Sequence, residues 1–159
     1  MGKNRMIARN MAPHEIDVTY NLFRQYCLEA AEVKPELDEQ WDKTSVIETI
    51  RSRNIHPEYV WINLLEGTRP VGFISGAVTQ CPWNHDIYYA HIELIFVLES
   101  HRNSSNFKML TDEFEQWARG MEATVITAGD IGIAPERTKK IYESIGFESG
   151  CFLTKELAE

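Results

Sequence analysis

The stretch HIELIFVLESHRNSSNFKML, residues 91–110, decides the fold prediction because its apolar pattern changes half-way along. Residues 91–97 are mostly apolar, which predicts a strand at the centre of a sheet. A polar loop follows, and apolar residues then recur at helical spacing from about residue 103 to residue 119. The expected inner face of this helix is Phe107, Leu110, Phe114 and Trp117. A central strand that leads into a helix through a short loop indicates an α/β fold.

The loop after this strand has the composition of an anion site. A helix N-terminus offers unpaired N–H groups and the positive end of the helix dipole, and phosphate groups bind there. Arg102 adds a fixed positive charge, and the hydroxyls of Ser104 and Ser105 can donate to phosphate oxygens. An ordinary polar turn, in which one of the serines caps the helix, explains the same residues. On this stretch alone, the ordinary turn is the better explanation.

The rest of the chain predicts strands and helices in the order β-α-α-β-β-β-α-β-α-β. The expected strands are 5–13, 58–66, 71–80, 87–97, 122–129 and 147–157, and the expected helices are 14–33, 35–53, 103–119 and 135–146. This order predicts one mixed α/β layer and differs from the regular alternation of a dinucleotide-binding fold. The 159 residues suit a single domain that spans 1–159.

Charge and hydropathy argue against several classes of partner. The net charge of −8 disfavours binding to a nucleic-acid backbone, which needs clustered cations. No apolar run approaches the roughly 18 residues of a membrane span, and the first ten residues lack the apolar core of a signal peptide. We therefore expect a cytoplasmic protein without a membrane partner. The acidity fits a neutral or cationic small substrate or a basic protein patch, and serves solubility equally well.

Cysteine and histidine spacing predicts no metal centre. Cys27, Cys81 and Cys151 are far apart and form no close pair, so free and mostly buried thiols are expected. His85 and His91 are six residues apart, with no third ligand at a recognisable spacing. We therefore expect no metal cofactor.

The element order and the loop together resemble the GNAT superfamily of acetyl-CoA-dependent N-acetyltransferases. That family carries a loop of the form Q/R-x-x-G-x-G/A, which cradles the pyrophosphate of CoA. The matching residues are Arg102, Asn103, Ser104, Ser105, Asn106 and Phe107. Arg102 matches, whereas Ser105 and Phe107 replace both glycines. Phe107 either turns into the core, in phase with Leu110 and Phe114, or crowds the phosphates and weakens the binding of CoA.

Two further stretches are similar to family motifs. ERTKKIYESIGF, residues 136–147, is similar to a helix that ends Y-E-x-x-G-F, in which the tyrosine protonates the departing CoA thiolate. The resemblance gives this role to Tyr142, for which a place in the core is the alternative. HIELIFV resembles the corresponding strand of glucosamine-phosphate acetyltransferases. The serine-bearing loop looks most like those of small phage and bacterial members.

The resemblance implies a fold and a set of cofactor contacts. The fold is a mixed, mainly antiparallel central sheet flanked by about four helices. Backbone groups freed near Phe96 and Val97 bond the pantetheine arm as an added strand would, with the amide of Val97 polarising the thioester. The loop 102–107 and Thr138 complete the expected acetyl-CoA contacts.

Glu93 is the candidate general base. It alternates with Ile95 and Val97, which places the three side chains on one face of the strand. A carboxylate on an otherwise apolar central strand is costly unless it is used or paired. We expect it to accept the proton of the incoming amine, directly or through water, and pairing with Arg69 is the alternative.

The acceptor is expected to be a primary amine of a small molecule or of a protein. The family position of the acceptor implies contacts from Tyr26, Trp41, Trp83, Asn84 and His85. Aromatic rings with acidic neighbours can hold an amine by cation–π contact, although scattered core or surface aromatics explain these residues equally well. A GNAT-fold protein that binds a partner without catalysis stays open as an alternative, as does an interaction domain unrelated to CoA. A homodimer is compatible with all of these.

Overall fold

The structure is a computed structural model that describes residues 5–129, 134–150 and 155–157. The chain falls into two compact units, Met1–Ala128 and Gly129–Glu159. The first unit contains the sheet. The second contains helix α5, Pro135–Glu143.

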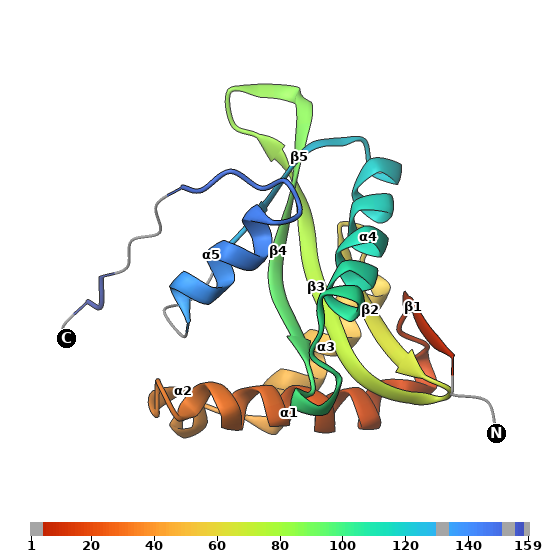
Figure 1. Ribbon diagram of the computed structural model, residues 1–159. Coiled ribbons are helices and arrows are strands. Elements are labelled where there is room, and N and C mark those ends of the chain that lie inside the picture. Colours follow the sequence, from red (N-terminus) through yellow and green to blue (C-terminus); the bar gives the residue numbers. More distant parts are fainter. Residues whose placement is uncertain (1–4, 130–133, 151–154, 158–159) are drawn as a thin grey trace. The chain divides into compact units, whose positions relative to one another are not determined.

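The sheet of the first unit has five strands in the order β1-β2-β3-β4-β5 (Figure 1). The strands are β1 Met6–Asn10, β2 Tyr59–Glu66, β3 Arg69–Cys81, β4 Asn84–Val97 and β5 Ala123–Ala128. The first four pair antiparallel and β5 pairs parallel to β4. The mixed, mainly antiparallel sheet that the resemblance implies is therefore confirmed.

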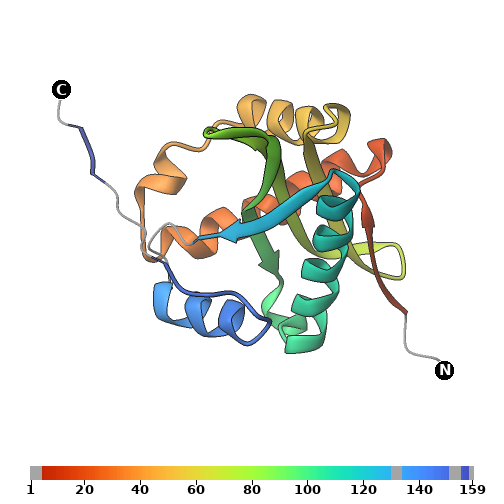
Figure 2. The same cartoon turned by 90° about the horizontal axis from the view of Figure 1, so that it is seen from above.

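Helices cover both faces of this sheet (Figures 1 and 2). The helices of this unit are the short η1 Pro13–Glu15, α1 Ile16–Ala31, α2 Glu36–Glu39, α3 Lys43–Ile55, the short η2 Glu99–His101 and α4 Ser104–Gly120. Phe23 of α1 packs on Phe73 at 5.5 Å between ring centroids, whereas Phe114 of α4 lies against Gly76. Residues 73 and 76 are an odd number apart in β3, so α1 and α4 lie on opposite faces.

The expected helix 35–53 is wrong as a single element, because it consists of α2 and α3. Asp42 begins α3: its carboxylate accepts hydrogen bonds from the backbone N–H of Ser45 at 2.9 Å and from the Ser45 hydroxyl at 2.6 Å. These bonds lower the pKa of Asp42 below its ordinary value. A well-capped new helix therefore starts where the sequence reads as continuous.

The buried face of α4 differs from the predicted one, because the helix is rotated by about one position. Leu110 and Phe114 are fully buried as expected, but Phe107 and Trp117 are only half-buried. Asn106, Thr111 and Ala118 take buried positions as well. Asn106 is tolerated there because its amide donates to the carbonyl of His101 at 2.7 Å.

Other expectations concern the ends of strands and the thiols. The loop predicted at 81–86 is a tight turn, since β3 ends at Cys81 and β4 starts at Asn84. No strand is assigned at 147–150, and residues 151–154 of the predicted last strand lie outside the described residues, as does Cys151.

Cys27 and Cys81 are free and buried, as predicted, and burial raises the pKa of the Cys27 thiol. None of the helices in the described ranges is long and apolar enough to cross a membrane.

Gly76 allows α4 to approach the sheet. A Cβ at this position would collide with the carbonyl oxygen of His91 and lie 2.7 Å from the ring of Phe114. We expect Gly76→Ala to lower the free energy of unfolding by about 2 to 3 kcal/mol, because a fully buried contact must open. Gly120→Ala is the matched control, since no atom lies within 4 Å of its Cβ position. Urea unfolding of both variants measures the difference, and equal stabilities would contradict this packing.

Candidate active site

A β-bulge interrupts β4 at Glu93. Ser75 of β3 pairs with Leu94 and Gly76 pairs with Ile92, so Glu93 has no partner in the register. A bulge sends two successive side chains toward the same side of a strand. Glu93 binds a residue of α3, and Leu94 packs on the core cluster beneath α1. The expected alternation of Glu93 with the residues that follow it is therefore wrong.

Arg53 of α3 holds the Glu93 carboxylate in a bidentate ion pair, with N–O distances of 2.9 Å and 2.6 Å. The guanidinium also lies 4.8 Å from the ring centroid of Tyr59. Both partners are partly shielded, the Arg53 side chain being 15% exposed and that of Glu93 32%. The pairing cation is thus Arg53 and not Arg69, which is exposed at the start of β3. An ionised carboxylate has about four lone-pair positions, so Glu93 can still accept from an amine or a water molecule.

Beyond the bulge, one edge of β4 is open. Pairing with β5 ends at Ile92 and Ala128, so residues 93–97 have no strand partner on that side within the described chain. The N–H of Leu98 donates to Val71 of β3 at 2.9 Å. Successive backbone groups of a strand point in opposite directions, so the N–H of Val97 is directed to the open side. Phe96 and Val97 are both buried there.

The open edge leads to the N-terminus of α4. Asn103 caps this helix by accepting from the N–H of Asn106 at 2.7 Å. The cap is therefore Asn103 and neither of the serines. Ser104 and Ser105 are exposed, and their N–H groups have no acceptor among the residues that the structure describes. The first turn contains no acidic residue, which leaves the positive end of the helix dipole available to an anion.

Arg102 is held in place beside this turn. Its Nε donates to the carbonyl of Val97 at 2.8 Å, and its guanidinium binds Glu29 of α1 at 2.6 Å. The guanidinium also lies 5.4 Å from the ring centroid of Phe96. Glu29 therefore neutralises the charge that the sequence offers to a phosphate, and an incoming anion has to compete with this carboxylate.

The second unit contains Thr138 and Tyr142 on α5. Tyr142 is buried and its ring meets that of Phe147 edge-on, at 4.9 Å between centroids. Gly146 has φ of +99°, a left-handed conformation that glycine adopts without strain. The backbone can then turn back, and the N–H of Phe147 donates to the carbonyl of Tyr142 at 3.1 Å. The spacing Y-E-x-x-G-F thus has a structural cause within this unit.

The five predicted acceptor contacts fall into two groups. Tyr26 and Trp41 both pack on Phe23 of α1, at 5.8 Å and 5.1 Å between ring centroids. Tyr26 is half-buried against Phe73 and Phe96, and Trp41 donates to the hydroxyl of Tyr20 at 3.0 Å. The other three, Trp83, Asn84 and His85, lie at the exposed turn between β3 and β4. Trp83 is 76% exposed there.

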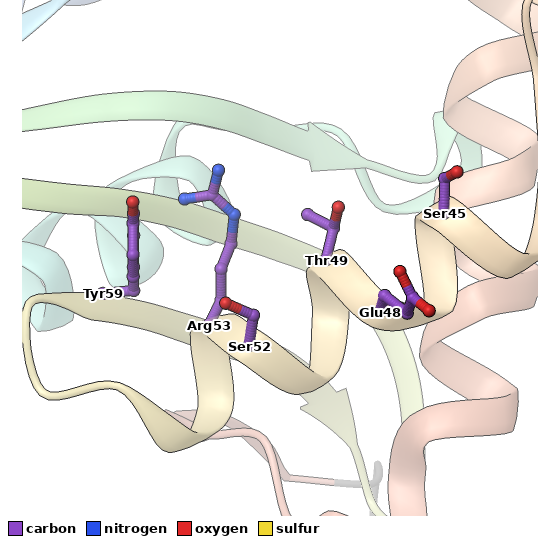
Figure 3. Close-up of a pocket in the computed structure, with 6 residues that line it drawn as sticks. All are labelled: Ser45, Glu48, Thr49, Ser52, Arg53 and Tyr59. Carbon is purple, nitrogen blue, oxygen red and sulfur yellow. The ribbon is translucent and has the colours of Figure 1, made fainter.

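Sequence reasoning missed a polar pocket on α3. The pocket has a volume of about 370 Å³ and is lined by Ser45, Glu48, Thr49, Ser52, Arg53 and Tyr59 (Figure 3). The signal was present in the sequence, because Ser45, Thr49 and Ser52 recur at helical spacing on one face. Ile50 is the only fully buried side chain of α3. The parts of the chain that are described contain no group of three or more metal-binding side chains.

A comparison of the sequence with known protein families identifies the family. Residues 17–147 match the acetyltransferase (GNAT) family. The chain belongs to the GNAT acetyltransferases. No curated protein matches the sequence.

Solved structures share the fold of this chain. One is the aminoglycoside N-acetyltransferase AAC(6′)-Iy in complex with CoA, with a TM-score of 0.79 and 14% identity over 99% of this chain and 97% of that chain. A second is a ribosomal-protein-alanine N-acetyltransferase from Brucella melitensis biovar Abortus 2308, with a TM-score of 0.70 and 13% identity over 98% of this chain and 99% of that chain. A third is a probable acetyltransferase, with a TM-score of 0.72 and 21% identity over 98% of this chain and 97% of that chain. The GNAT fold thus extends over nearly the whole chain.

Proposed function

We propose that this GNAT protein is an N-acetyltransferase that moves the acetyl group of acetyl-CoA to a primary amine. The observation that carries the proposal is the open edge of β4 at residues 93–97, which leads to the capped N-terminus of α4. An extended pantetheine arm can bond such an edge as an added strand would. The free N–H groups of Ser104 and Ser105 suit the pyrophosphate. The donor set therefore fits acetyl-CoA although both loop glycines are replaced.

Three groups of the chain each have one role in this reaction. Acetyl-CoA supplies the activated acyl group, whose C–S bond breaks as the bond from the amine nitrogen to the acyl carbon forms. Glu93 accepts the proton that the amine loses, directly or through water. The N–H of Val97 donates to the thioester oxygen, where negative charge develops. Tyr142 gives a proton to the departing sulfur.

We infer the acceptor class from the fold relatives and from the net charge of the whole chain. The fold relatives include enzymes named for aminoglycosides and for ribosomal-protein alanine, and both names imply an amine acceptor. The net charge of −8 favours the approach of a cationic amine. We place the enzyme in the cytoplasm.

Acetyl-CoA should bind and stabilise the fold. At a concentration one hundred times its Kd, a ligand that binds only the folded state adds about 2.7 kcal/mol to the free energy of unfolding. Thermal unfolding with and without millimolar acetyl-CoA measures this effect.

Ser104→Pro is the matched test of the α4 site. Proline suits the first position of a helix, and the extended backbone of Asn103 (φ −155°, ψ 167°) tolerates a following proline. The variant should keep its stability but lose one N–H donor, so its Kd for acetyl-CoA should rise about five- to tenfold. If acetyl-CoA does not stabilise the wild-type protein at all, the alternative of a GNAT-fold binding protein without catalysis is favoured.

A further inference from the structure

Three polar side chains that take no part in the proposed acetyl transfer form a hydrogen-bonded chain. They are Ser100 and His101 of η2 and Glu66 at the end of β2. The Ser100 hydroxyl oxygen lies 2.7 Å from Nδ1 of the His101 ring, and Nε2 of the same ring lies 3.0 Å from a carboxylate oxygen of Glu66. A hydroxyl, an imidazole and a carboxylate connected in this order are the parts of an activated serine nucleophile.

The carboxylate decides which nitrogen of the His101 ring carries the proton. An ionised carboxylate only accepts hydrogen bonds, so Nε2 donates to Glu66. In the neutral ring Nδ1 is then unprotonated, and it accepts from the Ser100 hydroxyl. His101 is therefore oriented as a base toward Ser100, and Glu66 stabilises the positive charge that the ring gains when it takes the hydroxyl proton.

The base is held in place, whereas the nucleophile is accessible. The N–H of His101 donates to the carbonyl of Leu98 at 2.8 Å, and the carbonyl of His101 accepts from the Asn106 amide at 2.7 Å. The His101 side chain is 17% exposed, and Ser100 lies on the surface. The N–H of Ser100 has no acceptor among the residues that the structure describes. It can therefore donate to the oxygen of a carbonyl group that Ser100 attacks.

We propose that Ser100, His101 and Glu66 form a second acyl-transfer centre, which hydrolyses small uncharged esters. The Oγ of Ser100 attacks the ester carbonyl carbon, and Nδ1 of His101 takes the hydroxyl proton and gives it to the oxygen of the departing alcohol. The C–O bond of the ester breaks, and the acyl group stays on Ser100. A water molecule, deprotonated by His101 in the same way, then releases the carboxylic acid and restores the serine hydroxyl.

The surroundings of Ser100 select the kind of ester. Glu99 precedes Ser100 in the chain, and Glu66 binds the other side of the imidazole. Two carboxylates near the nucleophile disfavour an anionic ester and accept an uncharged one. This reaction uses neither acetyl-CoA nor an amine, so the inference goes beyond the proposed function.

Hydrolysis of p-nitrophenyl acetate measures the activity. Ser100→Ala should lower the rate about 100-fold relative to the wild-type protein, which is the low end for a base-assisted step because the site is open to water. Glu66→Gln keeps an acceptor for Nε2 but removes the charge, and should lower the rate about tenfold. Because Ser100 is exposed, its change to alanine should leave the midpoint of thermal unfolding unchanged.

Ser144 provides a matched control. It is also exposed, but its hydroxyl donates to the carbonyl of Ile141 at 2.6 Å and has no imidazole beside it. Ser144→Ala should therefore keep the wild-type rate of ester hydrolysis. Diisopropyl fluorophosphate, which phosphorylates activated serines with loss of fluoride, should label Ser100 and not Ser144, and peptide mass spectrometry locates the label. His101→Gln should prevent this labelling.

The same measurements can overturn the inference. If Ser100→Ala keeps the wild-type rate, other groups of the surface react with the ester directly and the three residues form only a structural contact. Equal labelling of Ser100 and Ser144, or no labelling of either, would have the same meaning. The stabilisation by acetyl-CoA should be the same in Ser100→Ala and in the wild-type protein, so failure of the ester test leaves the proposed N-acetyltransferase unaffected.

Discussion

Tyr142→Phe should lower kcat for acetyl transfer about 100-fold while the KM for acetyl-CoA stays within about twofold. The change removes one hydroxyl and keeps the ring that packs edge-on against Phe147. A proton donor to the leaving sulfur acts only in the transition state, so its loss appears in kcat and not in ground-state binding. The expected effect is at the low end for a lost acid, because a CoA thiolate is a tolerable leaving group. Steady-state kinetics with saturating acceptor measures both constants.

Phe147→Leu separates the hydroxyl from the packing. This variant loses the ring contact with Tyr142 but keeps the hydroxyl, so it should lower stability while kcat per folded molecule is retained. If both variants lose activity in proportion to their loss of folded protein, Tyr142 is a core aromatic. If Tyr142→Phe keeps the wild-type kcat, another group protonates the sulfur.

Local sequence patterns predicted most of the elements because those elements depend on local signals. The apolar run at 91–97 and the helical spacing that follows it place β4 and α4 correctly. The glycine after the last helix has a positive φ, as the spacing of the motif requires. These features are set by residues within a few positions of one another.

Features that depend on distant residues were missed. The bulge at Glu93 arises from the register of two strands, and Gly76 on the neighbouring strand adapts to it. The partner of Glu93 is forty residues away on α3, and Arg69 was equally plausible from charge alone. Only the packing of the whole sheet decides the register at Glu93 and the cation that pairs with it. The cap of α4 is a local feature that was missed as well, because Asn103 and the two serines that follow it are all good caps.

Glu93→Gln should lower kcat/KM by about 100-fold near pH 7, and the loss should shrink as the pH rises. An alkylamine acceptor has a pKa of about 10.4, so at neutral pH nearly all of it is protonated and a base must assist. Near pH 10 the neutral amine is abundant and needs little help, so wild type and variant should differ less than about tenfold.

Glu93→Gln also weakens the ion pair with Arg53, so its stability has to be measured beside its activity. Glutamine can accept only through one oxygen, so the bidentate contact is lost and Arg53 keeps its charge with a weaker partner. For a partly exposed pair this should cost about 1 kcal/mol of stability, which is small beside the total stability of a domain of this size. Unfolding measurements therefore separate a misfolded variant from a catalytically impaired one. Glu115→Gln is the matched control, because Glu115 also pairs with an arginine but lies exposed on α4.

The pH dependence distinguishes a base from a binding group. A carboxylate that only attracts the ammonium form would become less important at high pH for binding, and its loss would raise KM while leaving kcat unchanged. A carboxylate that accepts the proton changes kcat itself, and most strongly where the amine is protonated. A loss in kcat that stays constant from about pH 7 to about pH 10 would contradict both roles. That result would leave Glu93 with a structural role only. Its bidentate ion pair would then serve to hold the Arg53 side chain against β4 at the bulge.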